Sequence, residues 1–309
     1  MDYKRKYIKY KNKYLSLKQE MTGGGASKMP DDFIHVRSIT KAVIGILYYL
    51  NEDENPREKN LLNDNTIGDA LNMNTRLKLN NYFHFDEFMN NVDSNSDLLK
   101  YSTEKLNNKD YVTRLDVPSF EYNDLMYQVL ASNLTDAAKK LAEFMGEPVN
   151  EDMKEYVYFT NKDGKEYSGF FKEGNGWKWH HTKDGQALGP NGIRMTKDFA
   201  LRFGDKVRDI VMEKSKENRQ TIPPYKDYEW SHNSTNVLKY YWNGWWISDK
   251  CAYAIGFKYQ YIALTPNGTK LQLYHEPNSE EEMIKSYEEG GALYDKKKFI
   301  NNIETSLND

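Results

Sequence analysis

The sequence has few residues that could cross-link it covalently or through a metal. Only Cys251 is a cysteine among its 309 residues, which excludes an internal disulfide bond and a cysteine-based metal cluster. No run approaches the roughly eighteen apolar residues of a membrane span, and the first residues lack the apolar core of a secretory signal. We therefore expect a protein that is not exported and that suits a reducing compartment.

The overall composition is that of a folded protein. Hydrophobic residues make up 39% and charged residues 29% of the chain, with 24 tyrosines and six tryptophans, which argues against disorder. A chain of this length can bury a large core, as one domain or as two lobes. The net charge is only -3, but residues 1–20 hold seven lysines and arginines against two acidic residues, so the remainder of the chain is distinctly acidic.

Residues 1–22 form a basic, aromatic leader. Its apolar positions alternate at spacings of four and three, which places them on one face of a helix; they are Tyr3, Tyr7, Tyr10, Tyr14 and Leu17. Such a helix could contact a partner protein, an anionic membrane surface or nucleic acid, and the alternative is a solubilising tail. Residues 23–29, which include three consecutive glycines, predict a flexible linker to a domain at 30–309.

The composition of this leader loosely resembles the lysine- and tyrosine-rich openings of many proteins of giant DNA viruses. That resemblance implies a viral protein, in the cytoplasm of an infected or expressing cell or in a virion.

Beyond the linker, helical patterns come first and strand patterns come last. Apolar residues at helical spacing predict helices over 38–50, from 66 to 73 and over 125–145. A hairpin is predicted around the Asn-Lys-Asp-Gly turn at 161–164, and further strands over 240–247, 252–264 and 270–275. We expect a helical lobe at about 60–200 beside an antiparallel sheet, an α+β architecture.

One tetrad in the first helical segment indicates chemistry. Ser38-Ile-Thr-Lys41 opens a strongly apolar run, and residues three apart share one helix face, so the Lys41 amine can reach the Ser38 hydroxyl. Burial disfavours a charged amine, so we expect Lys41 to lose its proton readily and to accept the proton of a serine nucleophile. These are the first two residues of a serine hydrolase site.

The same spacing occurs a second time without this context. Ser102 and Lys105 are also three apart, but the residues that follow are polar, and we expect no buried helix there. The tetrad alone is therefore weak evidence.

A tyrosine lies at the predicted entrance to the third helix. Tyr122, followed by Asn123 and Asp124, could face the Lys41 amine and relay a proton. The alternative is a half-buried packing tyrosine, of which a chain with 24 tyrosines has several.

Five blocks in this order resemble the class C β-lactamase-like and penicillin-binding serine hydrolases, most closely the branch of the 6-aminohexanoate-dimer hydrolases and related esterases. The resemblance covers roughly residues 33–275. The blocks are 38–41, 66–73, 122–124, 189–204 and 256–262. It implies a serine β-lactamase/DD-peptidase-like α+β fold, an antiparallel sheet flanked by helices, and no metal or other cofactor.

The resemblance also implies a role for each matching residue. Ser38 corresponds to the acylated nucleophile, Lys41 to its base and Tyr122 to the residue that passes the proton to the leaving group. The backbone N–H groups of Ser38 and Gln260 correspond to the oxyanion hole, which stabilises charge on the attacked carbonyl oxygen. Substrate contacts are implied for Asp124, Phe257, Lys258 and Tyr259, and we add Trp177 because the aromatic stretch 174–181 could line a cleft.

Four features depart from the family pattern. Only 37 residues precede Ser38, so we expect the N-terminal strands of the sheet to be missing. Tyr259 replaces a glycine that lets substrate lie against the strand, and Lys258 is one residue out of register. Asp124 replaces an asparagine, and its charge should disfavour the phenolate form of Tyr122.

These observations lead to two hypotheses. The first is a serine hydrolase that cleaves an amide or ester of a small or peptide-like substrate through a Ser38 acyl-enzyme, with esterase or amidase activity favoured over true β-lactamase activity. The second is a catalytically inactive binding or structural module with the basic leader as its docking element. His180 and His181 end the aromatic stretch 174–181, which we expect to be a loop. As adjacent residues they point apart, which favours a structural or cleft-wall role over metal ligation.

Overall fold

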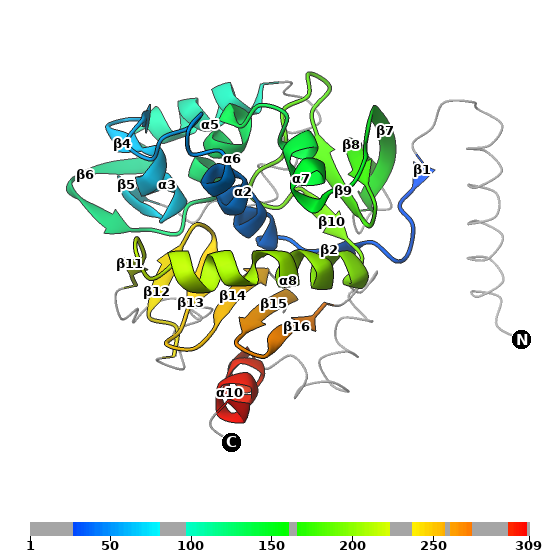
Figure 1. Ribbon diagram of the computed structural model, residues 1–309. Helices are drawn as coiled ribbons and strands as arrows, with labels where there is room; N and C mark the ends of the chain where they lie inside the picture. Colours follow the sequence, from blue (N-terminus) through cyan, green and yellow to red (C-terminus); the bar gives the residue numbers. More distant parts are fainter. Residues whose placement is uncertain are drawn as a thin grey trace, which may run out of the picture.

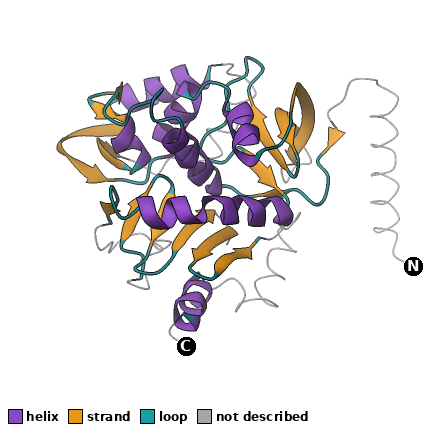
Figure 2. Ribbon diagram, in the orientation of Figure 1, coloured by secondary structure: helices purple, strands orange, loops and turns teal. Residues whose placement is uncertain are grey.

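The computed structural model describes residues 27–80, 97–160, 166–222, 237–256, 260–273 and 296–307. The predicted leader, most of the linker and the predicted substrate contacts Phe257, Lys258 and Tyr259 lie outside the described residues. The helices between residues 39 and 145 lie together with two small sheets, one larger sheet lies beside them, and the other larger sheet lies with the helices Lys197–Lys214 and Lys296–Ser306 (Figures 1 and 2). The predicted α+β class is confirmed by this arrangement.

Helix α2 (Ile39–Leu50) lies near the centre of the molecule (Figure 1). Its sequence is apolar on almost every side, and residues Ile39 to Tyr48 are all buried, as expected of a helix surrounded by other elements. It contacts α6 (Asp124–Asn133) and α7 (Ala137–Met145), and it also contacts β14 (Ala252–Gly256) and β15 (Gln260–Thr265). The helix that begins directly after Ser38 is therefore the central packing element of the fold.

The remaining helices pack on different elements of the fold. The short α3 (Ile67–Leu71) starts with a capping box between Thr66 and Asp69 and packs on α6, which also contacts α5 (Leu98–Asn107). Helix α8 (Lys197–Lys214), capped by Thr196, packs on β15 and on β16 (Gly268–Gln272). Helix α10 (Lys296–Ser306) attaches to the same sheet through Glu304, which accepts hydrogen bonds from Ser248 and Tyr253.

The C-terminal sheet is a six-stranded antiparallel meander in the order β11 (Gln220–Thr221), β12 (Tyr240–Trp242), β13 (Trp245–Ile247), β14, β15, β16. Within the described residues no strand from before residue 220 joins it. The last residue of β14, Gly256, lies against the segment before α2, since a Cβ on Gly256 would lie 2.3 Å from the Val36 carbonyl oxygen. This close contact brings the end of β14 next to the turn before Ser38.

A second six-stranded sheet lies beside the helices, in the order β1 (Ser27–Lys28), β7 (Val149–Thr160), β8 (Glu166–Gly174), β9 (Trp177–His181), β10 (Ile193–Met195), β2 (Ile34–His35). The β1–β7 pair is parallel and the other pairs are antiparallel. Two small sheets pair β3 (Asn60–Leu62) with β4 (Asn65–Thr66), and β5 (Asn74–Leu79) with β6 (Val112–Phe120). The segment 60–200 thus holds α3, α5, α6 and α7 together with four strands of this second sheet, β7 to β10. Of these, the β7–β8 pair is the hairpin predicted on either side of residues 161–164, which lie outside the described residues.

Several element boundaries differ from the sequence predictions. The single helix expected over 125–145 is two helices, α6 and α7, because Asp136 takes the left-handed conformation (φ 50°) between them. The strand expected over 240–247 is the hairpin β12–β13, turned at Asn243 and Gly244, which both have positive φ. Ser102 and Lys105 lie in helix α5, which is capped by Asp97 and buries only Leu98, Ser102 and Leu106. The polar residues that follow Leu106 are exposed and the helix ends at Asn107, so no buried helix continues there, as expected.

Among the described residues, no helix is both long and apolar enough to cross a membrane.

Candidate active site

Ser38 lies at the junction of β2 and α2. Arg37, directly before it, has a left-handed backbone (φ 54°) that turns the chain from the strand into the helix. A non-glycine residue in this conformation costs free energy, and such residues are enriched at functional sites. The Thr40 hydroxyl stabilises the turn by donating to the Arg37 carbonyl at 2.8 Å and by accepting a hydrogen bond from the Ile193 N–H at 3.1 Å. Ser38 is therefore held at a fixed position and remains partly exposed.

The Lys41 amine lies one helical turn further and contacts the serine, as predicted. Its Nζ donates to Ser38 Oγ at 2.9 Å and to the Pro190 carbonyl at 3.1 Å, and it pairs with Asp124 Oδ1 at 2.7 Å. An ammonium group has three N–H bonds, and these three acceptors match them. The side chain is only 1% exposed, so its charge is compensated almost entirely by the protein.

The structure corrects the expected charge of Lys41. Burial lowers its pKa, but the charge of Asp124, then that of Tyr122, and hydrogen bonds to both raise it, and the result lies above its ordinary value of 10.5. The sequence prediction of a lysine that loses its proton readily was wrong because it left out Asp124. In the unliganded site Lys41 is an ammonium ion.

Tyr122 joins this pair from a distant segment. Lys41 Nζ lies 4.8 Å from the centre of the Tyr122 ring, so the three residues assigned to catalysis share one site. Burial raises the pKa of Tyr122, Lys41 lowers it, Asp124 raises it, and hydrogen bonding with Ser38 lowers it; the result is a pKa above 10.0. Asp124 thus acts on the pKa of Tyr122 in the predicted direction, against the phenolate form.

Two elements hold Tyr122 in place. The backbone N–H groups of Glu121 and Asn123 donate to the Met73 carbonyl oxygen and sulfur, and the Asn123 side chain caps α6 by accepting the Met126 N–H at 3.1 Å. On the other side the ring of Trp246 stacks on Tyr122, with 6.0 Å between ring centres and 20° between planes. Trp246 lies in the segment predicted as a strand over 240–247 and was not among the predicted site residues.

The Pro190 carbonyl was also missed, since a backbone acceptor leaves no mark in the sequence. Its loop is fixed from α6, where Gln128 Oε1 accepts the Gly189 N–H at 2.9 Å and Nε2 donates to the Ala187 carbonyl at 2.9 Å. A Cβ at Gly189 would lie 2.3 Å from the Tyr127 carbonyl oxygen, so only glycine fits there. The glycine-containing block at 189–204 thus supplies one acceptor of the Lys41 amine.

The other predicted site residues differ in their placement. Gln260 begins β15 opposite Gly256, at the end of the β14–β15 pair that approaches Val36. The oxyanion role of the Gln260 N–H and that of the Ser38 N–H stay predictions. Trp177 is fully buried in β9, next to Phe199. The stretch expected as a cleft-lining loop is an interior strand, so Trp177 offers no surface to a substrate.

The second serine–lysine tetrad provides an internal comparison. Lys105 Nζ donates to the Tyr111 hydroxyl at 2.6 Å and lies over the Tyr111 ring. Ser102 Oγ is buried without a hydrogen-bond partner. Helical spacing alone therefore does not create a serine–lysine pair.

The two adjacent histidines are structural. His180 stacks on Phe171 at 5.0 Å, and His181 Nδ1 bonds the Trp179 carbonyl at 2.7 Å. Burial lowers the pKa of His180 to about 3 and that of His181 to about 4. Among the described residues, no group of three or more histidine, cysteine, aspartate or glutamate side chains is arranged to hold a metal.

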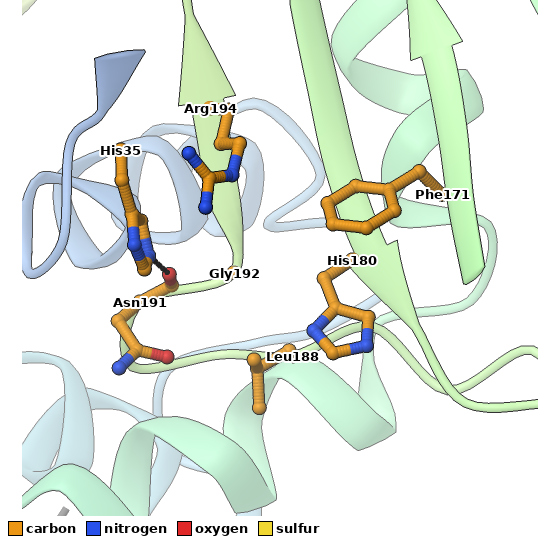
Figure 3. Close-up of a pocket in the computed structure, with 7 residues that line it drawn as sticks. All are labelled: His35, Phe171, His180, Leu188, Asn191, Gly192 and Arg194. Atoms are coloured by element: carbon orange, nitrogen blue, oxygen red, sulfur yellow. Dashed lines mark hydrogen bonds between the residues drawn. The ribbon is translucent and has the colours of Figure 1, made fainter. Parts of the chain in front are cut away.

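A small hollow lies behind the Pro190 loop (Figure 3). His35 closes one side by bonding the Asn191 carbonyl at 2.7 Å. Neither Ser38 nor Lys41 reaches it; its lining residues are His35, Phe171, His180, Leu188, Asn191, Gly192 and Arg194.

No protein-family model and no curated protein sequence matches the chain. Among solved structures, the chain is similar to a Bacillus anthracis protein assigned as a 6-aminohexanoate-dimer hydrolase, with 14% identity and a TM-score of 0.44 over 88% of this chain and 74% of that one. It is also similar to a penicillin binding protein from Bacillus halodurans, with 13% identity and a TM-score of 0.44 over 83% of this chain and 84% of that one. These similarities are too weak to assign a reaction, and the chemistry of the site depends on the contacts of Ser38, Lys41, Tyr122 and Asp124.

Proposed function

We propose that the chain is a serine hydrolase that cleaves an amide or ester bond through an acyl-enzyme on Ser38. The observation that supports this most is the contact between Lys41 Nζ and Ser38 Oγ at 2.9 Å, with Tyr122 adjoining the same nitrogen. A hydroxyl, an amine and a phenol in one partly buried site are what nucleophilic catalysis with proton transfer requires.

The reaction starts when Lys41 has lost one proton. Ser38 Oγ attacks the substrate carbonyl carbon, and the Ser38 proton passes to Lys41 Nζ. The carbonyl oxygen takes the negative charge, for which the Ser38 and Gln260 N–H groups are the proposed donors. The tetrahedral intermediate then collapses, the bond to the leaving group breaks, and Tyr122 donates a proton to it while taking one from Lys41. Water attacks the acyl-enzyme by the reverse relay and releases the acid.

A labelling experiment tests this function. A fluorophosphonate probe reacts with activated serines, so we expect it to modify the wild-type chain on the peptide that contains Ser38. The Ser38→Ala variant should lose the label. Ser102→Ala is the matched control, because Ser102 has the same spacing to a lysine but no contact with it, and it should label like the wild type.

The alternative is an inactive binding or structural module. The Lys41–Asp124 ion pair favours it, because an ammonium cannot accept the Ser38 proton. If folded wild-type protein reacts with neither a fluorophosphonate nor a β-lactam over a range of pH, this alternative replaces the hydrolase.

A further inference from the structure

The carboxylate of Asp124 lies at the boundary between the buried site and solvent. Its side chain is 25% exposed, whereas that of Lys41, its partner, is 1% exposed. Asp124 is also the first residue of α6, where the helix dipole stabilises a negative charge. The Oδ1 atom that contacts Lys41 is buried, but the side chain as a whole is partly exposed, so Asp124 is suited to contact a substrate as well as the catalytic amine.

The same carboxylate sets the charge of the lysine. Burial alone lowers the pKa of Lys41, and Asp124 is the foremost group that raises it. A second cation paired with Asp124 would cancel that effect and add repulsion toward Lys41. Lys41 would then release a proton to solvent and become the free amine that attack by Ser38 requires.

From this geometry we propose that Asp124 selects substrates with a cationic group on the acyl side, two or three bonds from the scissile carbonyl. The short distance follows because the carboxylate and Ser38 Oγ both contact the same Lys41 nitrogen. The inference rests on the proposed hydrolase function. It names the substrate class as amides or esters of short amino acids with a free ammonium group.

The acyl side is favoured because both half-reactions need Lys41 without its extra proton. A cation on the leaving group departs after the first half-reaction, and the Lys41–Asp124 pair would form again before water attacks. A cation on the acyl group stays beside Asp124 until the acid is released. No atom is gained or lost beyond ordinary hydrolysis, since the proton that Lys41 gives to solvent on binding returns when the product leaves.

Two esters of matched shape test the proposal. In 4-nitrophenyl 3-aminopropanoate an ammonium group replaces the terminal methyl group of 4-nitrophenyl butanoate. For each, kcat/KM at neutral pH is divided by the rate of its reaction with hydroxide, which removes the difference in intrinsic reactivity. We expect the wild type to prefer the cationic ester at least tenfold, a factor that corresponds to about 1.4 kcal/mol.

The variants separate Asp124 from general charge effects. In Asp124→Asn we expect the ratio to fall to about one, while hydrolysis of the neutral ester becomes faster. Asp198→Asn is the matched control: Asp198 lies in the first turn of α8 and pairs with Arg202 at 2.9 Å, and its ratio should equal that of the wild type.

The possible failures are distinguishable. If the wild type hydrolyses both esters with a ratio near one, or if Asp124→Asn keeps the wild-type ratio, the proposed selectivity is wrong while the hydrolase function stands. If neither ester is hydrolysed faster than by Ser38→Ala, the hydrolase function itself fails. If Asp124→Asn does not fold, a third ester tests the proposal on the wild type alone. The monoester 4-nitrophenyl succinate has a carboxylate on its acyl side, and we expect its normalised kcat/KM to be at least tenfold lower than that of the butanoate. A smaller difference would overturn the proposed selectivity.

Discussion

Lys41 forms one ion pair and two hydrogen bonds, and these determine the chemistry of the site. With Ser38, Pro190 and Asp124 as acceptors, the amine is best matched as an ammonium. The nucleophile and its base are therefore assembled, but the base still holds its proton. At the scale of single residues, hydrolysis therefore depends on what removes that proton from Lys41.

The pH dependence of hydrolysis provides a direct prediction. The pKa of Lys41 is raised above 10.5, so kcat/KM for a neutral ester should increase with pH until Lys41 loses its proton. Asp124→Asn removes the foremost raising effect and leaves burial, which lowers the pKa, so the rise should move by about one pH unit or more toward lower pH. A pH profile of 4-nitrophenyl butanoate hydrolysis measures this. An unshifted profile would show that Asp124 does not control the base.

Sequence reasoning was most successful where spacing fixes geometry. Ser38 and Lys41 lie three residues apart in a helix, so their contact could be predicted. Tyr122 could be singled out by its place at the start of a predicted helix, but only the resemblance to a family favoured a catalytic role over that of a packing tyrosine. The charge of Lys41 could not be predicted, since it depends on a carboxylate 83 positions away that the fold brings to 2.7 Å.

At the scale of elements, the site depends on how closely the β12–β13 hairpin approaches α2. Gly244, at the tip of the hairpin, has a φ of +89°, and a Cβ there would lie 2.5 Å from the Lys41 carbonyl oxygen and the Ala42 nitrogen. The neighbouring Trp246 stacks on Tyr122. One hairpin thus contacts the backbone of the lysine and the ring of the tyrosine.

Gly244→Ala should therefore be costly. The added methyl group meets helix backbone, which cannot rotate away, in addition to an unfavourable left-handed φ, so we expect a loss of more than about 3 kcal/mol in the free energy of unfolding. Gly146→Ala is the control, because Gly146 also has a positive φ (+75°) but nothing within 4 Å of the added atom; we expect a loss of about 1 kcal/mol. Urea unfolding of the two variants measures the difference, and equal losses would contradict the close approach.

Boundaries between elements were harder to predict than the elements themselves. The helical pattern over 125–145 continues through Asp136, and only the left-handed backbone at that residue divides it into α6 and α7. Aspartate is among the residues that tolerate this conformation, but many aspartates do not adopt it. The Asn243-Gly244 pair is a turn signal, but the tryptophans on both sides of it favoured the prediction of one continuous strand over 240–247.

At the scale of the whole molecule, the two sheets have different roles. The C-terminal sheet contacts α2 and reaches the turn before the nucleophile, whereas β9 of the other sheet has a buried aromatic interior with His180 and His181. Sequence patterns predicted the β7–β8 hairpin of one sheet and most strands of the other, but β9 was expected as a loop, and local patterns do not specify that 149–195 and 220–272 form separate sheets. That partition depends on contacts between distant segments.

The buried histidines predict sensitivity to acid. In the folded chain the pKa of His180 is lowered to about 3 and that of His181 to about 4, whereas both are near 6.5 when exposed. The unfolded state therefore takes up protons first, and the free energy of unfolding should be constant above pH 6.5 and fall below it, by about 1.4 kcal/mol per pH unit for each histidine. Urea titrations between pH 7 and pH 5 measure this slope.

His180→Gln is the informative variant for this prediction. It removes one of the two groups, so the slope below pH 6.5 should decrease by about 1.4 kcal/mol per pH unit even if the variant is less stable overall. The same slope in the variant and the wild type would mean that His180 is protonated in the folded chain.

The central claim is that Ser38 carries the substrate's acyl group during turnover. Rapid acid quenching of the reaction with 4-nitrophenyl butanoate, followed by peptide mass spectrometry, tests it most directly. The account predicts a butanoyl group on the peptide that contains Ser38, with neither adduct nor enzymatic hydrolysis in Ser38→Ala. A butanoyl group on another residue, or hydrolysis by Ser38→Ala at the wild-type rate, would contradict it.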